Sequence, residues 1–254
     1  MNWISDIKLC GVDDNWVNRL DQLLESTLFP DGNLNDIVAS LRKGESLTYE
    51  QGLRLWNHPN LSDIAHLAHM SKVARYGNNV FFNSNLHINQ TNICTLACKF
   101  CAFRRGPKAK DAYALGVDDF IRRLAPFEHR IDELHTVGGL HPDWDVTYYE
   151  HLFSSIKDRF PGIHIKSLSA VEIKHIAEVS GIRPRDLLSR LQRAGLDSLP
   201  GGGAEILDDD VRDIICYGKE SSDEYISIHR AAHSIGMPTN CTMLFGTIET
   251  PEQR

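Results

Sequence analysis

The chain has 254 residues, a length that one α/β barrel can occupy without splitting into further domains. Its formal net charge of −7 and isoelectric point near 5.9 offer no basic stripe for a nucleic-acid backbone, so we expect no nucleic-acid partner. The first residues lack the apolar core of a signal peptide, and no later stretch reaches the apolar length of a membrane span. We therefore expect a cytoplasmic protein without a membrane partner.

The N-terminal part of the chain is predicted to be helical. Residues 46–75 carry apolar side chains at roughly helical intervals, and Pro59 interrupts this pattern. Asn60 to Asp63 can then begin a second helix. We predict an N-terminal helical cap over residues 1–80 and a barrel domain over residues 81–254.

Strands and helices are predicted to alternate through the second domain. The candidate strands are residues 85–90, 133–137, 164–168, 198–199 and 239–244. The candidate helices are residues 118–124, 148–159, 183–194, 208–215 and 222–234. This alternation is typical of right-handed β-α-β units with a parallel sheet, as in a TIM-type barrel. Because active sites of such barrels lie at the C-terminal ends of the strands, the loops there are the candidate site.

The loop after the first predicted strand contains Cys94, Cys98 and Cys101 in a C-x3-C-x2-C spacing. Three thiolates can hold a four-iron cluster and leave one iron without a protein ligand, whereas an electron carrier normally closes all four corners. The alternative is a structural zinc site, for which His87 or His135 is the nearest fourth ligand. The remaining cysteines, Cys10, Cys216 and Cys241, are expected to be small buried hydrophobic side chains without disulfides.

The cysteine spacing, with Phe100 directly before the third cysteine, resembles the radical S-adenosylmethionine (SAM) superfamily. The resemblance implies a [4Fe-4S] cluster whose open iron is chelated by the amino and carboxylate groups of SAM. An electron from the cluster then cleaves SAM to methionine and a 5′-deoxyadenosyl radical. A reducing partner such as flavodoxin or ferredoxin is also implied.

A set of further motifs looks like the aminofutalosine synthase family of the menaquinone futalosine pathway. These motifs are His87–Cys94, Lys99–Phe103, Gly138–Pro142, His164–Lys166, Ala170–Ile173, Leu196–Ile206 and Thr242–Gly246. The resemblance implies addition of the deoxyadenosyl radical to the enol ether of 3-[(1-carboxyvinyl)oxy]benzoate. Rearrangement through attack on the arene and loss of CO2 would then give 6-amino-6-deoxyfutalosine, so that SAM is consumed.

A substrate with two carboxylates needs cationic or donor partners, and Arg side chains match carboxylates with two hydrogen bonds. Arg104 and Arg105 follow the cysteine loop, and Lys166 with His164 lies at the end of the third predicted strand. His141, after the Gly-Gly turn, can face the substrate. We predict His141, Lys166 and Arg105 as the catalytic side chains.

The glycines and polar residues at the strand ends are predicted to bind SAM. Glycine lets backbone groups approach a ligand closely, and we expect Gly138 and Gly139 to contact the amino group of SAM. Ser169 and Glu172 can hydrogen-bond its ribose or amino group, and Phe100 is expected beside the adenine.

The chain differs from the family pattern in two ways. Thr247 stands where that pattern has histidine, and the chain stops just after the fifth predicted strand, so we expect a C-terminally truncated barrel. Cyclic dehypoxanthine futalosine synthase and deazaflavin-cofactor synthases remain alternatives, and they release free 5′-deoxyadenosine. A non-catalytic iron–sulfur carrier would need a fourth nearby cysteine, and Cys216 and Cys241 are far along the chain.

Overall fold

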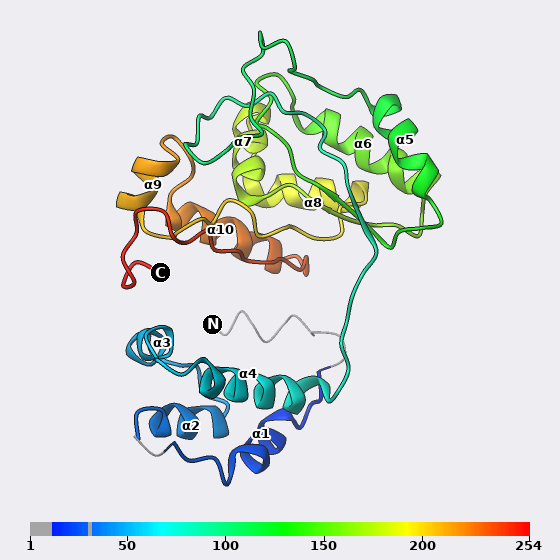
Figure 1. Ribbon diagram of the computed structural model, residues 1–254. Coiled ribbons are helices and arrows are strands. Elements are labelled where there is room, and N and C mark those ends of the chain that lie inside the picture. Colours follow the sequence, from blue (N-terminus) through cyan, green and yellow to red (C-terminus); the bar gives the residue numbers. More distant parts are fainter. Residues whose placement is uncertain (1–11, 30–31) are drawn as a thin grey trace. The chain divides into compact units, whose positions relative to one another are not determined.

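A computed structural model describes residues 12–29 and 32–254, and Cys10 lies outside these residues (Figure 1). The chain divides into two compact units, one ending at Phe82 and the other beginning at Asn83. Each helix in the described part of the chain falls short of the length and apolarity that a membrane span needs.

The first unit contains four helices around an apolar core. These are α1 (Trp16–Leu24), α2 (Asn35–Arg42), α3 (Tyr49–Trp56) and α4 (Leu61–Tyr76). Leu20, Leu24 and Ile37 are completely buried between them. The break at Pro59 is confirmed, since α3 ends at Trp56 and Asn60 caps α4 by accepting a hydrogen bond from the Ser62 N–H at 3.1 Å.

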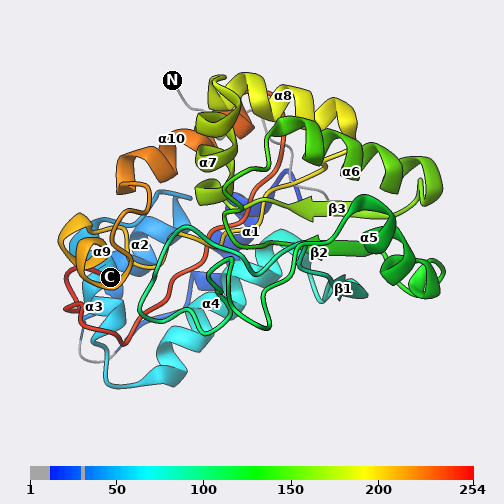
Figure 2. The same ribbon diagram turned by 90° about the horizontal axis from the view of Figure 1, so that it is seen from above.

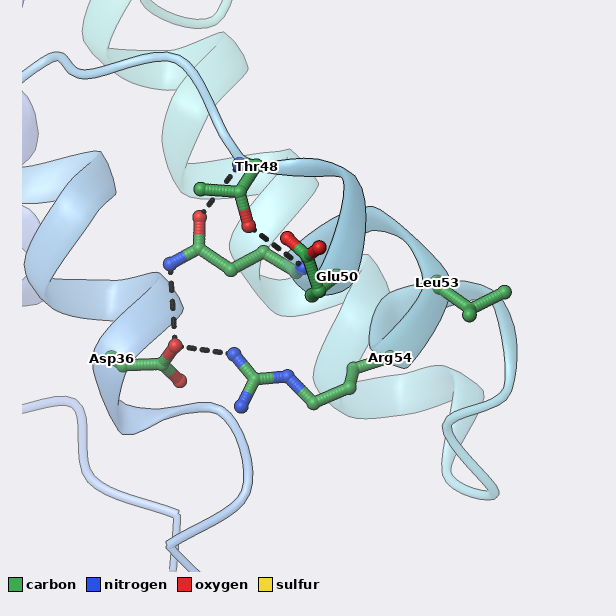
Figure 3. A pocket seen from close by; sticks show the side chains of 6 residues that line it. Asp36, Thr48, Glu50, Leu53 and Arg54 are labelled. Carbon is green, nitrogen blue, oxygen red and sulfur yellow. Dashed lines mark hydrogen bonds and ion pairs between the residues drawn. The ribbon is translucent and has the colours of Figure 1, made fainter. Parts of the chain in front are cut away.

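An open pocket on this helical unit is lined by residues of α2 and α3 (Figure 3). Gln51 donates to the Asp36 carboxylate at 3.2 Å, and Arg54 forms an ion pair with the same carboxylate. Gln51 and Thr48 also form the capping box that begins α3. Because these polar side chains pair with one another, their interactions hold α2 and α3 together.

The second unit is built on a parallel sheet in the order β1 (Asn85–His87), β2 (Glu133–Thr136) and β3 (His164–Ser167). Side chains alternate between its faces. Leu134 and Ile165 are completely buried on one face, whereas His87, His135 and Lys166 belong to the other. The three strands confirm the first three predictions, with each strand one to three residues shorter at its C-terminal end.

The fourth predicted strand, residues 198–199, is present as two bridge residues, whereas the fifth, residues 239–244, is right in position but wrong in extent. Ser198 forms a parallel bridge with Lys166, and Leu199 forms one with Thr239. The chain therefore continues the ladder in sequence order, as a barrel does. Residues 240–244 form no strand, because the segment leaves the ladder after the Asn240 N–H has donated to the Leu199 carbonyl at 3.1 Å.

Helices cover the apolar face of this sheet (Figure 2). They are α5 (Val117–Leu124) with the 3-10 turn Ala125–Phe127, α6 (Val146–Arg159), α7 (Ala170–Ser180), α8 (Pro184–Ala194) and α10 (Ser222–His233). The helix α9 (Asp209–Ile215) packs instead in a separate small apolar cluster. All five predicted helices are present. The helix α7 was not predicted, although Ser169 and Glu172 have the S-x-x-E spacing of a capping box at its start. The α/β fold thus has the strand-helix alternation of a partial barrel.

Candidate functional site

The cysteine loop lies between β1 and α5 and is fixed by backbone hydrogen bonds on three sides. The Cys94 N–H donates to the Arg105 carbonyl at 3.1 Å, which closes the loop on itself. The Thr95 N–H donates to the Leu140 carbonyl at 3.1 Å, and the Lys99 N–H donates to the Ile215 carbonyl at 2.8 Å. The loop therefore contacts both the segment after β2 and the C-terminal end of α9.

The Gly-Gly turn after β2 packs directly against the beginning of the cysteine loop. A Cβ atom on Gly139 would lie 2.2 Å from the Ile93 carbonyl oxygen and 3.0 Å from the Cys94 Cβ. A Cβ on Gly138 would lie 2.7 Å from the Gln90 side chain. Glycine is thus required here for contact with the cysteine loop itself. A larger side chain at Gly139 would therefore displace the cysteine loop.

Glu172 joins the ends of all three strands through a buried carboxylate. Its Oε1 accepts hydrogen bonds from the Gly138 N–H at 2.9 Å and from the Gln90 side chain at 3.2 Å. Its Oε2 accepts from the Ser169 N–H at 2.8 Å and Oγ at 2.7 Å. Burial raises the pKa of Glu172, while these hydrogen bonds act in the opposite direction. Ser169 and Glu172 therefore hold the turn at Gly138, and Gln90 is a member of this group that sequence reasoning missed.

The three motif thiols are half-buried and close enough to influence one another. Burial raises the pKa of the Cys98 thiol to about 11; the nearby Lys219 lowers it, and charge on Cys216, Cys94 or Cys101 raises it. In the described part of the chain, no three His, Cys, Asp or Glu side chains are arranged around a single ion position. Three cysteine thiols on one loop are the kind and number of donors that a four-iron cluster with one open iron takes from a protein.

The other two described cysteines differ from expectation. Cys216 is buried as expected, but it packs in the same small apolar cluster as Cys98, although 118 positions separate them in the sequence. Cys241 is exposed, which contradicts its prediction as a buried side chain. Its backbone lies against Gly201, where a Cβ would come within 2.6 Å of the Cys241 Cα, so the contact is made by main chain and not by the thiol.

The two arginines after the cysteine loop have different surroundings. Arg105 donates through Nε to the Asp111 carboxylate at 2.6 Å and through Nη1 to the Ala102 carbonyl at 2.8 Å and the Arg104 carbonyl at 2.9 Å. This argues against the prediction that Arg105 is a free carboxylate ligand, because its donors already fasten the loop. Arg104 is half-buried, and its Nε is buried without a hydrogen-bond partner within residues 12–29 and 32–254.

The polar face of the sheet contains the other predicted substrate groups. Lys166 Nζ lies 2.9 Å from the Glu133 carboxylate, so its charge is already neutralised, which weakens its prediction as a catalytic cation. His164 Nε2 lies 2.7 Å from Ser198 Oγ. The rings of His87 and His135 stack with their centroids 4.8 Å apart, and burial lowers the pKa of His135. The Nε2 atom of His135 is buried and has no partner in the described chain.

His141 and Thr247 are both held by local contacts. The His141 ring stacks on Trp144 with centroids 4.4 Å apart, and its Nδ1 accepts a hydrogen bond from the Asp143 N–H at 3.2 Å. Burial lowers the pKa of His141, which favours a neutral ring. Thr247 donates to the Glu249 carboxylate at 2.8 Å, and the Gly246 N–H donates to the same carboxylate. Thr247 thus belongs to a tight turn.

The family model described as "Radical SAM superfamily" matches residues 88–254. Since this match covers most of the chain, the chain belongs to the radical SAM superfamily. It is an enzyme of that kind, whose cofactors are a [4Fe-4S] cluster and SAM. The carrier and zinc alternatives are thereby set aside.

Two curated relatives are similar to most of the chain. Aminodeoxyfutalosine synthase of Streptomyces coelicolor is 39% identical over 224 residues, which are 88% of this chain and 58% of that protein. The 5-amino-6-(D-ribitylamino)uracil–L-tyrosine 4-hydroxyphenyl transferase of Methanothermobacter thermautotrophicus is 39% identical over 83% of this chain and 58% of that protein. The chain thus spans less than two thirds of the length of either relative.

A solved structure supports the fold. The crystal structure of HydG, a maturase of the [FeFe]-hydrogenase, matches 97% of this chain and 54% of that chain with a TM-score of 0.67 and 15% identity. At this identity the likeness concerns the fold alone, and it agrees with the barrel expected from the alternation of strands and helices.

Proposed function

We propose that the protein catalyses the aminodeoxyfutalosine synthase reaction. In this reaction one electron breaks the bond between sulfur and the adenosyl carbon of SAM, methionine leaves, and the adenosyl carbon bonds to the enol ether of 3-[(1-carboxyvinyl)oxy]benzoate. The rearranged radical then loses its carboxyl group as CO2 and gives one electron back, so the overall reaction is redox-neutral. The observation that carries the proposal is the 39% identity to the Streptomyces coelicolor enzyme over 88% of the chain. That match is accompanied by a cysteine loop fastened at the strand ends, where barrel enzymes bind their substrates.

Cys94, Cys98 and Cys101 are the proposed ligands of the cluster. When bound and reduced, the cluster would supply the electron that cleaves SAM. The hydrogen bonds of Cys94, Thr95 and Lys99 keep the loop backbone in place, so that binding would require mainly side-chain rotation. The loop also keeps the exposed Phe100 ring near this site, where it can stack on an adenine.

The turn at Gly138 and Gly139 is proposed to contact bound SAM through its backbone. Its position depends on Glu172, whose Oε1 accepts from the Gly138 N–H, and on Ser169, which donates to Oε2 of the same carboxylate. We therefore propose that Ser169 and Glu172 act on SAM by positioning this turn. Their hydrogen-bonding groups are already used within the chain.

Arg104 is the proposed partner of one substrate carboxylate. Its buried Nε has no acceptor in the described chain, whereas the corresponding atom of Arg105 is paired with Asp111. A guanidinium with an unused donor can gain a charge-assisted hydrogen bond when a carboxylate binds. The neutral His141 ring is the proposed contact for the aromatic part of the substrate, since it already lies in a stack with Trp144.

The test is anaerobic reconstitution of the chain, followed by mass spectrometry of the products formed from SAM and 3-[(1-carboxyvinyl)oxy]benzoate with a flavodoxin or a chemical reductant. We expect 6-amino-6-deoxyfutalosine that carries the adenosyl part of SAM, and no such product from the Cys98→Ala variant. Free 5′-deoxyadenosine as the only nucleoside product of a protein with full iron content would contradict the proposal. It would favour a relative with another reaction, such as the transferase of equal identity.

A further inference from the structure

A group of buried charged residues lies directly behind the cysteine loop. It consists of Glu205, Arg212, Lys219 and Glu220, whose side chains are at most 12% exposed. Lys219 Nζ lies 2.6 Å from the Glu205 carboxylate, and Arg212 Nη2 lies 3.3 Å from that of Glu220. Burying charged groups costs free energy even when they are paired. Apolar side chains would fill this space at a lower desolvation cost, so the retained charges call for another explanation.

Arg212 has a structural role in this group. Its guanidinium donates to the Ala204 carbonyl at 2.5 Å, to the Gly203 carbonyl at 3.2 Å and to the Glu220 carbonyl at 2.6 Å. It therefore connects α9 to the Gly-rich loop that precedes it. Lys219 makes no comparable set of contacts, since Glu205 is its one ion-pair partner within the described residues.

Lys219 extends toward the cysteine loop. Its Nζ lies 5.8 Å from the centre of the Phe100 ring, and its charge acts on the Cys98 thiol. The backbone is anchored at the same place, because the Lys219 N–H donates to the Cys216 carbonyl at 3.1 Å and the Lys99 N–H donates to the Ile215 carbonyl at 2.8 Å. Cys98 also packs against the small apolar cluster that contains Ile215 and Cys216. The ammonium is therefore held next to the loop by main-chain and side-chain contacts together.

We infer that the positive charge of Lys219 raises the reduction potential of the cluster held by this loop. The inference rests on the proposed ligation of the cluster by Cys94, Cys98 and Cys101. Reduction adds one negative charge, and a buried cation beside the cluster favours the more negative state. Glu205 keeps the ammonium in place and offsets part of its field, because its carboxylate is 2.6 Å away. The pair therefore makes the cluster easier to reduce than a site without Lys219.

The test compares Lys219→Met, Lys219→Arg and Glu205→Gln with the wild-type chain and with Lys174→Met. Lys174 of α7 is the control, since it too forms an ion pair, at 2.7 Å with Glu224 of α10, but it is not among the groups that act on the Cys98 thiol. Iron content is measured first in each reconstituted protein. The reduced cluster is then titrated against solution potential by electron paramagnetic resonance. SAM is left out, so that replacing a lysine whose only role is to bind SAM would leave the measured potential unchanged.

We expect Lys219→Met to retain iron and to lower the reduced-to-oxidised ratio at a fixed potential about tenfold, which corresponds to roughly 59 mV for one electron. Lys219→Arg and Lys174→Met should keep the wild-type potential, and Glu205→Gln should shift it upward. An unchanged potential in an iron-replete Lys219→Met protein would refute the inference. If Lys219→Met fails to hold iron, Glu205→Gln decides, because an unchanged or lower potential there refutes it as well.

These outcomes can be distinguished from failure of the proposed function. Loss of iron in the cysteine variants is the measure of ligation, and mass spectrometry identifies the reaction. Suppose that the wild-type protein makes another nucleoside, while the reduction potential of Lys219→Met is still lower than that of the wild type. The proposed reaction would then be wrong, and the inferred role of Lys219 would stand.

Discussion

Replacing Gly139 by alanine tests whether the Gly-Gly turn and the cysteine loop form one packed unit. The new Cβ would lie 2.2 Å from the Ile93 carbonyl oxygen and 2.6 Å from its carbon, both of which are main-chain atoms. Reaching 3.0 Å, below which real Cβ contacts are essentially absent, requires the two segments to separate by about 0.8 Å. That movement would strain the hydrogen bond from the Gly139 N–H to the Thr91 carbonyl and displace Cys94.

The expected destabilisation is about 3 kcal/mol, at the upper end of the usual cost of overpacking. For a domain of this size it corresponds to a decrease in melting temperature of roughly 6–12 °C. The assay is thermal unfolding of the apo protein, together with iron content after reconstitution. Gly162→Ala is the control, because a Cβ there meets nothing within 4 Å. A Gly139→Ala protein with the stability and iron content of Gly162→Ala would refute the close packing.

Three further predictions concern the cluster, the substrate and the stability of the fold. Cys94→Ala, Cys98→Ala and Cys101→Ala should each reduce iron well below about four per chain, whereas Cys216→Ala and Cys241→Ala should retain it, as iron analysis and the visible spectrum will show. Arg104→Met should raise KM for the substrate by roughly tenfold to a hundredfold, as expected for a lost hydrogen bond to a charged group, and should leave the iron content unchanged. Arg105→Met should instead lower the iron content, because Arg105 fastens the cysteine loop to Asp111. Burial, with His233 nearby, lowers the pKa of His229 from 6.5 to about 4, so the unfolded state takes up a proton first and stability falls as the pH decreases from 6.5 toward 4. Urea unfolding at pH 7 and pH 5 should show a loss of about 2 kcal/mol from this group, which His229→Phe removes; an equal loss in both proteins would contradict the assignment.

The strand and helix pattern could be predicted because burial follows it closely. Leu134 and Ile165 are both completely buried on the helix-covered face, so alternation within short strands was a sufficient signal. The sequence does not delimit the helix α7, because the spacing of Ser169 and Glu172 fits both ligand binding at a strand end and the start of a helix. The hydrogen bond from the Ser169 N–H to Glu172 shows that this pair caps α7, while its role toward SAM stays a prediction.

The contacts between distant segments could not be predicted from local patterns. Cys98 and Cys216 are neighbours because α9 packs against the cysteine loop, and the intervening strands and helices determine that approach. Arg104 and Arg105 are adjacent in the sequence and chemically identical. The difference between them depends on where Asp111 lies after the loop has folded back. The motif therefore indicated the chemistry of the site, while the choice of individual cations required the structure.

Glu172 offers the sharpest test of how the strand ends are connected. In Glu172→Gln, the side-chain NH2 group must face either the Gly138 N–H and the Gln90 amide, or the Ser169 N–H and hydroxyl. In either orientation a buried main-chain donor loses its acceptor, which costs about 1–3 kcal/mol. Glu178→Gln is the control on the same helix, since its side chain is 64% exposed and lies 3.8 Å from Lys174. Because Gly138 and Gln90 both contact the segments that hold the cysteine loop, we expect Glu172→Gln to lower both the melting temperature and the iron content. If Glu172→Gln and Glu178→Gln melt together and load iron equally, the carboxylate does not organise the site, and the three strand ends are held by the backbone ladder alone.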